Sequence, residues 1–241
     1  MAKVLITGGT RGIGHNLVEI FASKGYDVAT CSRNEKELNQ LIKDITQKHK
    51  NIEFFARQCN ISNKAEIVNF ANLVLENFGT PDVIVNNAGI FIPGTISEEN
   101  ENDFEIQINT NLASVYHLTR VLLPSLKEKK SGFIFNMCST ASITAYTGSA
   151  SYCISKFALL GFSKLLREEL KPFNIRVCSV MPGATLTSSW DGTSLPVERF
   201  IDSKELADLM FSIYKNSNSM NVEELIVRPP KGDINDSNYN Q

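Results

Sequence analysis

Short apolar runs alternate along this chain with longer stretches of helical period, and this alternation constrains the fold more than any other feature. The apolar runs are rich in β-branched residues; they are KVLI, DVATC, IEFFARQ, DVIVN, GFIFNMC, IRVCSV and EELIVR. Between the first two runs, Ile13, Leu17 and Phe21 recur at helical spacing before Gly25 closes the stretch. Strands separated by helices favour right-handed βαβ units, so we expect an α/β fold with a parallel sheet covered on both faces.

The chain is expected to form one domain followed by a short tail. A length of 241 residues suits a single α/β domain, which we place at residues 1–231. Two later helices are expected to be the longest, at about 103–127 and 151–171. From Gly232 the sequence GDINDSNYNQ is polar and lacks any period, which is typical of a flexible tail over residues 232–241.

Composition excludes several classes of partner. A formal charge of −2 and a pI near 6.0 provide no electrostatic footprint for nucleic acid or for an anionic membrane. No secretory pattern opens the chain, and no window approaches the roughly 20 apolar residues of a membrane span. The five cysteines form no CxxC pair and the three histidines no local metal motif. We therefore expect a cytoplasmic protein with reduced thiols and no metal.

A glycine-rich segment, LITGGTRGIG, runs from the first strand into the first helix. Gly8, Gly12 and Gly14 stand where the chain must turn tightly and let a phosphate approach its backbone, next to the N–H groups of a helix N-terminus. Their spacing is not the G-x-G-x-x-G of the general dinucleotide fingerprint, and a glycine cluster alone also fits a tight turn. Its position inside the first βαβ unit favours phosphate binding.

The end of the second strand bears on the choice of cofactor. A carboxylate there would bind a ribose diol, whereas an arginine would pair with a 2′-phosphate. This chain has Ser32 and Arg33 at that place, and Arg11 in the glycine-rich segment supplies a second positive charge. Two ordinary surface arginines are the alternative interpretation. Together the two arginines favour NADP(H).

The segment YCISK places Tyr152 and Lys156 four residues apart. On a helix this spacing sets the phenol and the ammonium on one face, although many amphipathic helices share it.

Six motifs then occur in order: TGGTRGIG, NNAG, NTNLAS, Ser139, YCISK and MPG. Their order and approximate spacing resemble those of the short-chain dehydrogenase/reductase family over about residues 3–228. This resemblance implies a single Rossmann domain with a doubly wound, seven-stranded parallel sheet. It also implies an oxidoreductase that acts on CH–OH or C=O groups and assembles as a homodimer or homotetramer.

The resemblance assigns a catalytic tetrad of Asn111, Ser139, Tyr152 and Lys156. Tyr152 would donate a proton to the substrate oxygen, and the ammonium of Lys156 would lower the pKa of that phenol. Ser139 would hydrogen-bond the same oxygen, and Asn111 would hold a water linking Lys156 to solvent. The cofactor contacts that the resemblance implies are Gly8, Thr10, Arg11, Gly12, Ile13, Gly14, Ser32, Arg33, Asn60, Ile61, Asn87, Ala88, Gly89, Tyr152, Lys156, Pro182, Gly183, Thr185 and Thr187.

The substrate is less constrained than the reaction. Phe91, Tyr146 and Trp190 are candidate walls of the pocket. Within the family, the segments INTNL, SSW and EELIVRPP are similar to those of bacterial proteins described as sepiapterin reductases. This favours NADPH-dependent reduction of a small carbonyl compound such as a pterin diketone. Two alternatives stay open: a reductase of 3-oxoacyl thioesters, and a non-catalytic dinucleotide sensor or scaffold.

Overall fold

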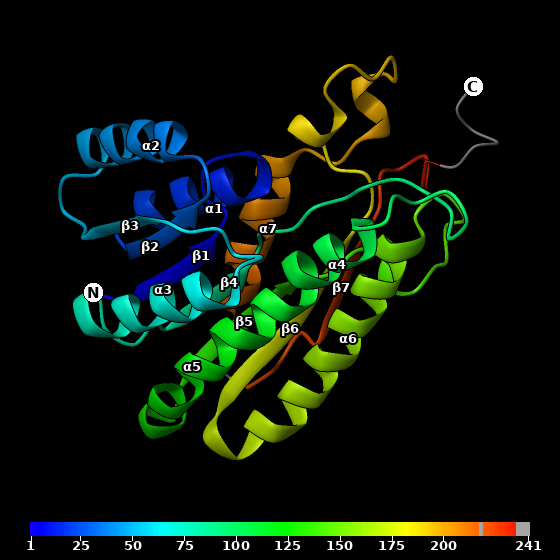
Figure 1. Cartoon of the computed structure of the whole chain (residues 1–241). Coiled ribbons are helices and arrows are strands. Elements are labelled where there is room, and N and C mark those ends of the chain that lie inside the picture. The colour runs from blue at the N-terminus through cyan, green and yellow to red at the C-terminus, as the bar shows by residue number, and fades with distance from the viewer. Residues whose placement is uncertain (217–218, 235–241) are drawn as a thin grey trace.

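Seven parallel strands form one sheet with helices on both faces in the computed structural model, which describes residues 1–216 and 219–234 (Figure 1). The strand order is β3-β2-β1-β4-β5-β6-β7, and every neighbouring pair is parallel. The strands are β1 (Lys3–Thr7), β2 (Asp27–Ser32), β3 (Phe54–Gln58), β4 (Val83–Asn86), β5 (Gly132–Met137), β6 (Ile175–Pro182) and β7 (Glu224–Val227). The predicted doubly wound α/β fold is confirmed.

Helices connect these strands and divide between the two faces (Figure 1). They are α1 (Gly12–Ser23), α2 (Glu35–Lys48), α3 (Lys64–Asn77), α4 (Asp103–Ile108), α5 (Ser114–Lys129), α6 (Ala150–Leu170) and α7 (Ser203–Lys215). Helices α1, α2 and α7 pack their apolar stripes on one face, where Leu17, Leu41 and Met210 are buried. Helices α3, α5 and α6 cover the other face. Both faces of the strands are therefore apolar, as expected for a buried parallel sheet.

The helix expected at about 103–127 contains one π turn. One π turn, Asn109–Ala113, separates α4 from α5. The backbone stays helical from Asp103 to Lys129, so the long helix expected here is present, and only its hydrogen-bond pattern changes at the π turn. Such π turns are frequent at functional sites.

Strands β1 and β4 are neighbours, and their connections leave on opposite faces of the sheet. The chain passes from β1 into α1 on one face and from β4 towards α4 and α5 on the other. The loops beyond these strands therefore diverge, which opens a crevice at the carboxyl edge of the sheet.

The end of the chain is partly attached to this edge. The predicted flexible tail begins at residue 232, yet Asp233 accepts hydrogen bonds from the Tyr146 hydroxyl (2.8 Å) and from Arg228 Nε (3.1 Å). Residues 235–241 of that prediction lie outside the described residues. Within the described part, no helix combines the length and apolar character needed to cross a membrane. The same residues contain no cluster of three or more potential metal ligands.

Candidate active site

A groove of about 1420 Å³ runs along the carboxyl edge of the sheet, lined by loops that follow strands β1 to β6. The predicted site residues that line it are Gly8, Arg11, Gly12, Ile13, Gly14, Ser32, Arg33, Asn60, Ile61, Asn87, Ala88, Gly89, Phe91, Ser139, Tyr146, Tyr152, Lys156, Pro182, Gly183, Thr185, Thr187 and Trp190. Two predicted residues do not line it. Thr10 instead places its Oγ1 3.1 Å from Ser32 Oγ, and Asn111 is buried.

The glycine-rich segment forms a tight cradle at one end of the groove. Gly12 has a φ of +52°, and a Cβ there would lie 2.8 Å from Cγ2 of Thr187. A Cβ at Gly14 would overlap the Gly8 carbonyl oxygen. No side chain caps the N-terminus of α1, whereas Asn34 caps α2. The N–H groups at the start of α1 are thus left without a side-chain cap beside closely packed backbone, which fits the pyrophosphate of a dinucleotide.

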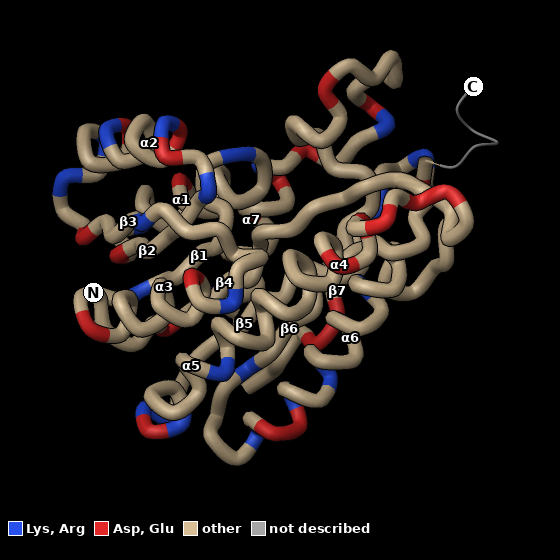
Figure 2. Tube along the Cα trace, in the orientation of Figure 1, with Lys and Arg blue, Asp and Glu red and all other residues tan. Residues whose placement is uncertain are grey.

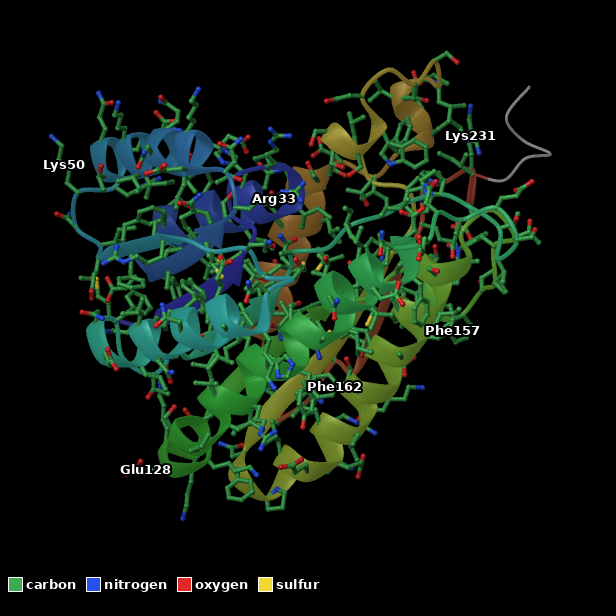
Figure 3. All side chains as sticks on the ribbon, in the orientation of Figure 1. Arg33, Lys50, Glu128, Phe157, Phe162 and Lys231 are labelled. Carbon is green, nitrogen blue, oxygen red and sulfur yellow. The ribbon has the colours of Figure 1, made fainter. Side chains whose placement is uncertain are left out.

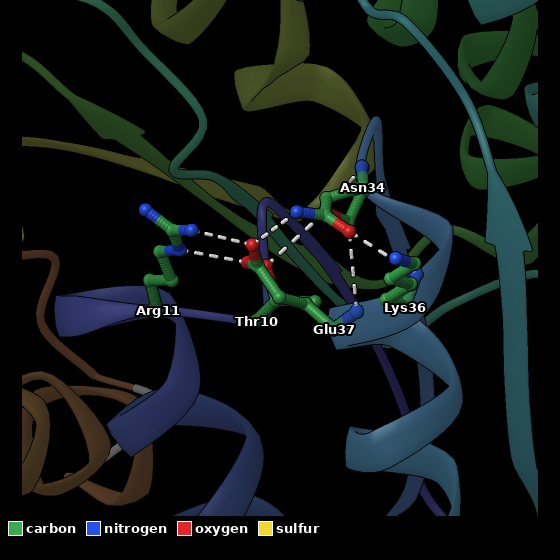
Figure 4. A network of polar contacts seen from close by, with 6 residues as sticks. Thr10, Arg11, Asn34, Lys36 and Glu37 are labelled. Carbon is green, nitrogen blue, oxygen red and sulfur yellow. Dashed lines mark hydrogen bonds and ion pairs between the residues drawn. The ribbon is translucent and has the colours of Figure 1, made fainter.

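Basic and acidic groups meet at the same end of the groove. In Figure 2, basic segments in the loops after β1 and β2 stand beside the acidic start of α2. Arg33 lies just beyond β2 (Figure 3) and is exposed. Arg11 is not free: its guanidinium forms an ion pair with Glu37, a residue that the sequence analysis did not single out (Figure 4).

Tyr152 lies in the first turn of α6, on the wall of the groove. Burial raises the pKa of its phenol to about 12, and a hydrogen bond with Ser139 partly opposes this rise. The Phe91 ring packs edge-on against the Tyr152 ring, with centroids 5.0 Å apart. The pKa of the phenol is therefore raised, opposite to the expected lowering, because burial is the largest cause and the charge of Lys156 is not among the causes of the shift.

Lys156 lies one turn further along α6 and is only 5% exposed. Its Nζ donates a hydrogen bond to the Met137 carbonyl oxygen (2.8 Å) and lies 5.6 Å from the centroid of the Tyr152 ring. Burial lowers the pKa of the ammonium to about 8. The two groups therefore face the same groove, and burial disfavours the charged form of each.

Asn111 sits in the π turn beside these groups. Its Nδ2 donates to the Ile90 carbonyl (2.9 Å) and to Ser155 Oγ (3.0 Å), while its Oδ1 accepts from the Ile90 amide (2.8 Å). A Cβ at Gly89 would lie 3.1 Å from Asn111 Oδ1 and 3.5 Å from Lys156 Nζ, so the two side chains are neighbours. The Asn111 side chain joins the loop after β4 to α6, and its water-holding role stays a prediction.

Glu99 was also missed by sequence reasoning. Its carboxylate accepts hydrogen bonds from the backbone amide (2.8 Å) and the hydroxyl of Ser151, in the first turn of α6. Ser149, the residue at the N-cap, makes no capping bond with its own side chain. A carboxylate that is distant in sequence therefore caps the helix carrying Tyr152. Nothing in the local sequence signals this pairing.

The three candidate wall residues surround the open part of the groove. Phe91 is 47% exposed, and Trp190 packs edge-on against Phe200 with centroids 4.9 Å apart. Tyr146 hydrogen-bonds Asp233 and Thr140, so the C-terminal segment forms part of the wall. Aromatic surface and the half-buried carboxylate of Asp233 thus lie within one cavity.

Comparisons with known proteins agree with this geometry. The family model described as short chain dehydrogenase matches residues 2–195. The chain is 29% identical over 246 residues to the sepiapterin reductase of Chlorobaculum tepidum, covering 97% of this chain and 98% of that protein. It is 29% identical to a 3-oxoacyl-acyl-carrier-protein reductase of Staphylococcus aureus, covering 86% and 87% of the two chains. An alcohol dehydrogenase of Thermococcus sibiricus, solved with 5-hydroxy-NADP, superposes with a TM-score of 0.88 at 27% identity, covering 97% and 99%.

Proposed function

The chain belongs to the short-chain dehydrogenase family of oxidoreductases, and we propose that it reduces a small carbonyl compound to an alcohol with NADPH. The observation that carries this proposal is the convergence of Ser139, Tyr152 and Lys156 on the same groove as the glycine cradle. Arg11 and Arg33 at the cradle's end favour a cofactor with a 2′-phosphate. The sensor or scaffold alternative does not require this convergence.

Each of these groove residues has a separate role in the proposed reaction. NADPH, when bound, supplies the hydride. The Ser139 hydroxyl and the Tyr152 phenol hydrogen-bond the substrate oxygen more strongly as negative charge develops on it. Tyr152 then donates its proton to that oxygen, and the nearby Lys156 ammonium stabilises the phenolate that remains. The Met137 carbonyl holds the Lys156 side chain in the groove wall.

The substrate class that we propose is a compact carbonyl compound with a flat ring, such as a pterin diketone. Phe91 and Trp190 supply aromatic surface on the groove. The similarity to the Chlorobaculum tepidum sepiapterin reductase supports the same choice.

An acyl carrier protein fits this surface less well. The segment before and within α4 carries Glu98, Glu101 and Glu105, all exposed. This segment forms part of the rim of the groove, because Pro93 and Ile106 line it. An acidic carrier protein approaching this rim would meet like charge, which opposes association. The observation favours a free small molecule over a 3-oxoacyl thioester on a carrier, despite the Staphylococcus aureus relative.

The test is NADPH oxidation across a panel of pterin diketones, small diketones, aldehydes and 3-oxoacyl thioesters. We expect turnover with the diketones and ring-bearing ketones, and a loss of about 10²- to 10⁴-fold in Tyr152→Phe. NADPH binding by Tyr152→Phe should change by no more than about twofold, since the phenol contributes chiefly to proton transfer. Normal turnover by Tyr152→Phe would refute the assignment, and a panel without any turnover would favour the sensor.

We also propose that a second copy of the chain covers the outer faces of α5 and α6. Figure 3 labels Phe157 and Phe162 on α6, and exposed apolar side chains on the two helices include Tyr116, Phe157 and Leu165. Large exposed apolar patches mark interaction sites. Leu165→Glu should convert a dimer or tetramer into a smaller species in light scattering; an unchanged mass would refute this interface.

The proposed cellular site is the cytoplasm. The five cysteines are free and buried, which is compatible with a reducing compartment.

A further inference from the structure

We propose that Glu37 is a cofactor-specificity residue whose carboxylate competes with the 2′-phosphate of NADP(H) for Arg11. The competition would reduce the preference for NADPH over NADH. This inference rests on the proposed use of NADP(H), and it concerns residues of α2 and the glycine-rich segment that the reaction itself does not use.

The contact between the two side chains has the geometry of arginine bound to an oxyanion. Arg11 Nε donates to Glu37 Oε2 at 2.7 Å, and Arg11 Nη2 donates to Glu37 Oε1 at 2.5 Å (Figure 4). A guanidinium that binds phosphate uses the same fork of parallel N–H groups. The Glu37 carboxylate therefore occupies the donors that a phosphate would need.

The position of Glu37 is fixed by its surroundings. It lies in the first turn of α2, where Asn34 Oδ1 accepts from its backbone amide at 3.3 Å, and Asn34 Nδ2 donates to its carboxylate. Figure 4 shows the carboxylate held between Arg11 and Asn34. Because the backbone of α2 and the Asn34 amide both hold Glu37, the carboxylate stays beside the groove when Arg11 turns towards another anion.

Glu37 affects Arg11 more strongly than any other acidic residue near it. The hydrogen bond with Glu37 is the main cause of the raised pKa of Arg11, and Asp191 contributes only a weaker field. The pKa of Glu37 is lowered, chiefly by the same hydrogen bond, and Arg33 adds to this effect. Glu37 therefore stays ionised at neutral pH and lies within the field of both arginines. A 2′-phosphate approaching these arginines meets a fixed negative charge.

The size of the effect follows from the exposure of the pair. The Arg11 side chain is 63% exposed and that of Glu37 is 24% exposed, so solvent screens their attraction. Exposed pairs of this kind contribute little to stability, and breaking one should change an affinity by about three- to fivefold. The effect should appear only for ligands that carry a 2′-phosphate.

Binding of adenosine fragments tests the proposal without any turnover. Adenosine 2′,5′-bisphosphate and 5′-AMP differ only in the 2′-phosphate, and calorimetry gives the affinity of each for the full chain. In Glu37→Gln the bisphosphate should bind about three- to fivefold tighter, while 5′-AMP should change by less than about twofold. The NADPH-to-NADH affinity ratio should rise by the same factor.

Two further variants separate the proposed role from a structural one. Glu35→Gln removes the same charge from the same turn of α2, where Glu35 is exposed. It should leave both affinities within about twofold of the wild type. In an Arg11→Gln background, Glu37→Gln should tighten binding of the bisphosphate less than it does in the wild-type background, because the guanidinium for which Glu37 competes is gone and only the field of its charge remains.

Three results would overturn the proposal. They are an unchanged or weaker affinity of Glu37→Gln for the bisphosphate, an equal gain for 5′-AMP, and an equal gain in Glu35→Gln. Failure of the proposed function looks different. A wild type that reduces carbonyls with NADH alone would refute the NADPH assignment, while the fragment affinities would still decide the role of Glu37.

Discussion

Replacing Lys156 by methionine should stabilise the protein while removing its activity. The side chain is 5% exposed, and its pKa falls from 10.5 to about 8 because burial disfavours the ammonium. Each pKa unit corresponds to about 1.4 kcal/mol, so keeping this ammonium charged at pH 7 costs the fold about 3 kcal/mol. Methionine fills a similar volume but loses the hydrogen bond to the Met137 carbonyl, at a cost of about 1 kcal/mol. A net stabilisation of about 2 kcal/mol remains.

The predicted stability difference between Lys156→Met and the wild type depends on pH. The folded pKa of Lys156 lies below the unfolded one, so the unfolded chain binds more protons between about pH 8 and 10.5. Wild-type stability should therefore rise with pH across that window, and the penalty should be fully present below pH 8. The advantage of Lys156→Met should shrink by about 2 kcal/mol between pH 7 and pH 9.5. Urea unfolding of both proteins at both pH values measures it, since other titrating groups cancel in the difference.

Lys164 provides the matched control, because it lies on the same helix with 56% of its side chain exposed. Lys164→Met breaks only a surface pair with Glu224 and should change stability by less than about 1 kcal/mol at either pH. The reasoning is refuted if Lys156→Met is less stable than wild type at pH 7, or if its advantage does not depend on pH.

Three further substitutions test how the site is held. Gly12 has a left-handed backbone conformation, and Gly12→Ala would place a Cβ there against the Thr187 side chain. This substitution should lower the free energy of unfolding in urea by about 1–2 kcal/mol and weaken NADPH binding. Gly161→Ala, at a position with open space inside α6, should instead stabilise the fold by about 1 kcal/mol, and a loss would contradict the helical assignment. Glu99→Gln removes the charged cap of α6, so stability should drop by about 1 kcal/mol and kcat should fall while the KM for NADPH holds. An unchanged kcat would limit Glu99 to a purely structural role.

Much of the fold could be predicted because its signals are local. Each apolar run needs only its own residues to indicate a strand, and Gly25, whose φ is +79°, ends the first helix region as its position predicts. The π turn between α4 and α5 has no such signal. In this turn, the Asn111 side chain forms hydrogen bonds with Ile90 and with Ser155, which is 44 positions away in the sequence. A hydrophobic period cannot reveal a change of hydrogen-bond register that distant partners stabilise.

The site shows the same division between local and distant information. The groove residues could be found because parallel strands bring all their carboxyl ends to one edge of the sheet. Glu37 and Glu99 could not, since they act on residues 26 and 52 positions away. The pKa of Tyr152 was predicted in the wrong direction because the sequence shows a neighbouring lysine but not the burial of both groups. A sequence shows which side chains can carry a charge, but only the folded structure shows which of them are removed from water.

That desolvation bears on the direction of the reaction. With a pKa of about 12, the Tyr152 phenol is almost wholly protonated at neutral pH, so it can donate a proton to a carbonyl oxygen without prior titration. Alcohol oxidation would need the phenolate, which this environment disfavours. Lys156, with a pKa of about 8, is charged at pH 7 and loses its charge as the pH rises. Carbonyl reduction should therefore weaken above about pH 8, as the cation that stabilises the developing phenolate is lost, whereas oxidation gains its base only at higher pH. A protonated phenol beside a charged ammonium at neutral pH is the state that the proposed carbonyl reduction requires.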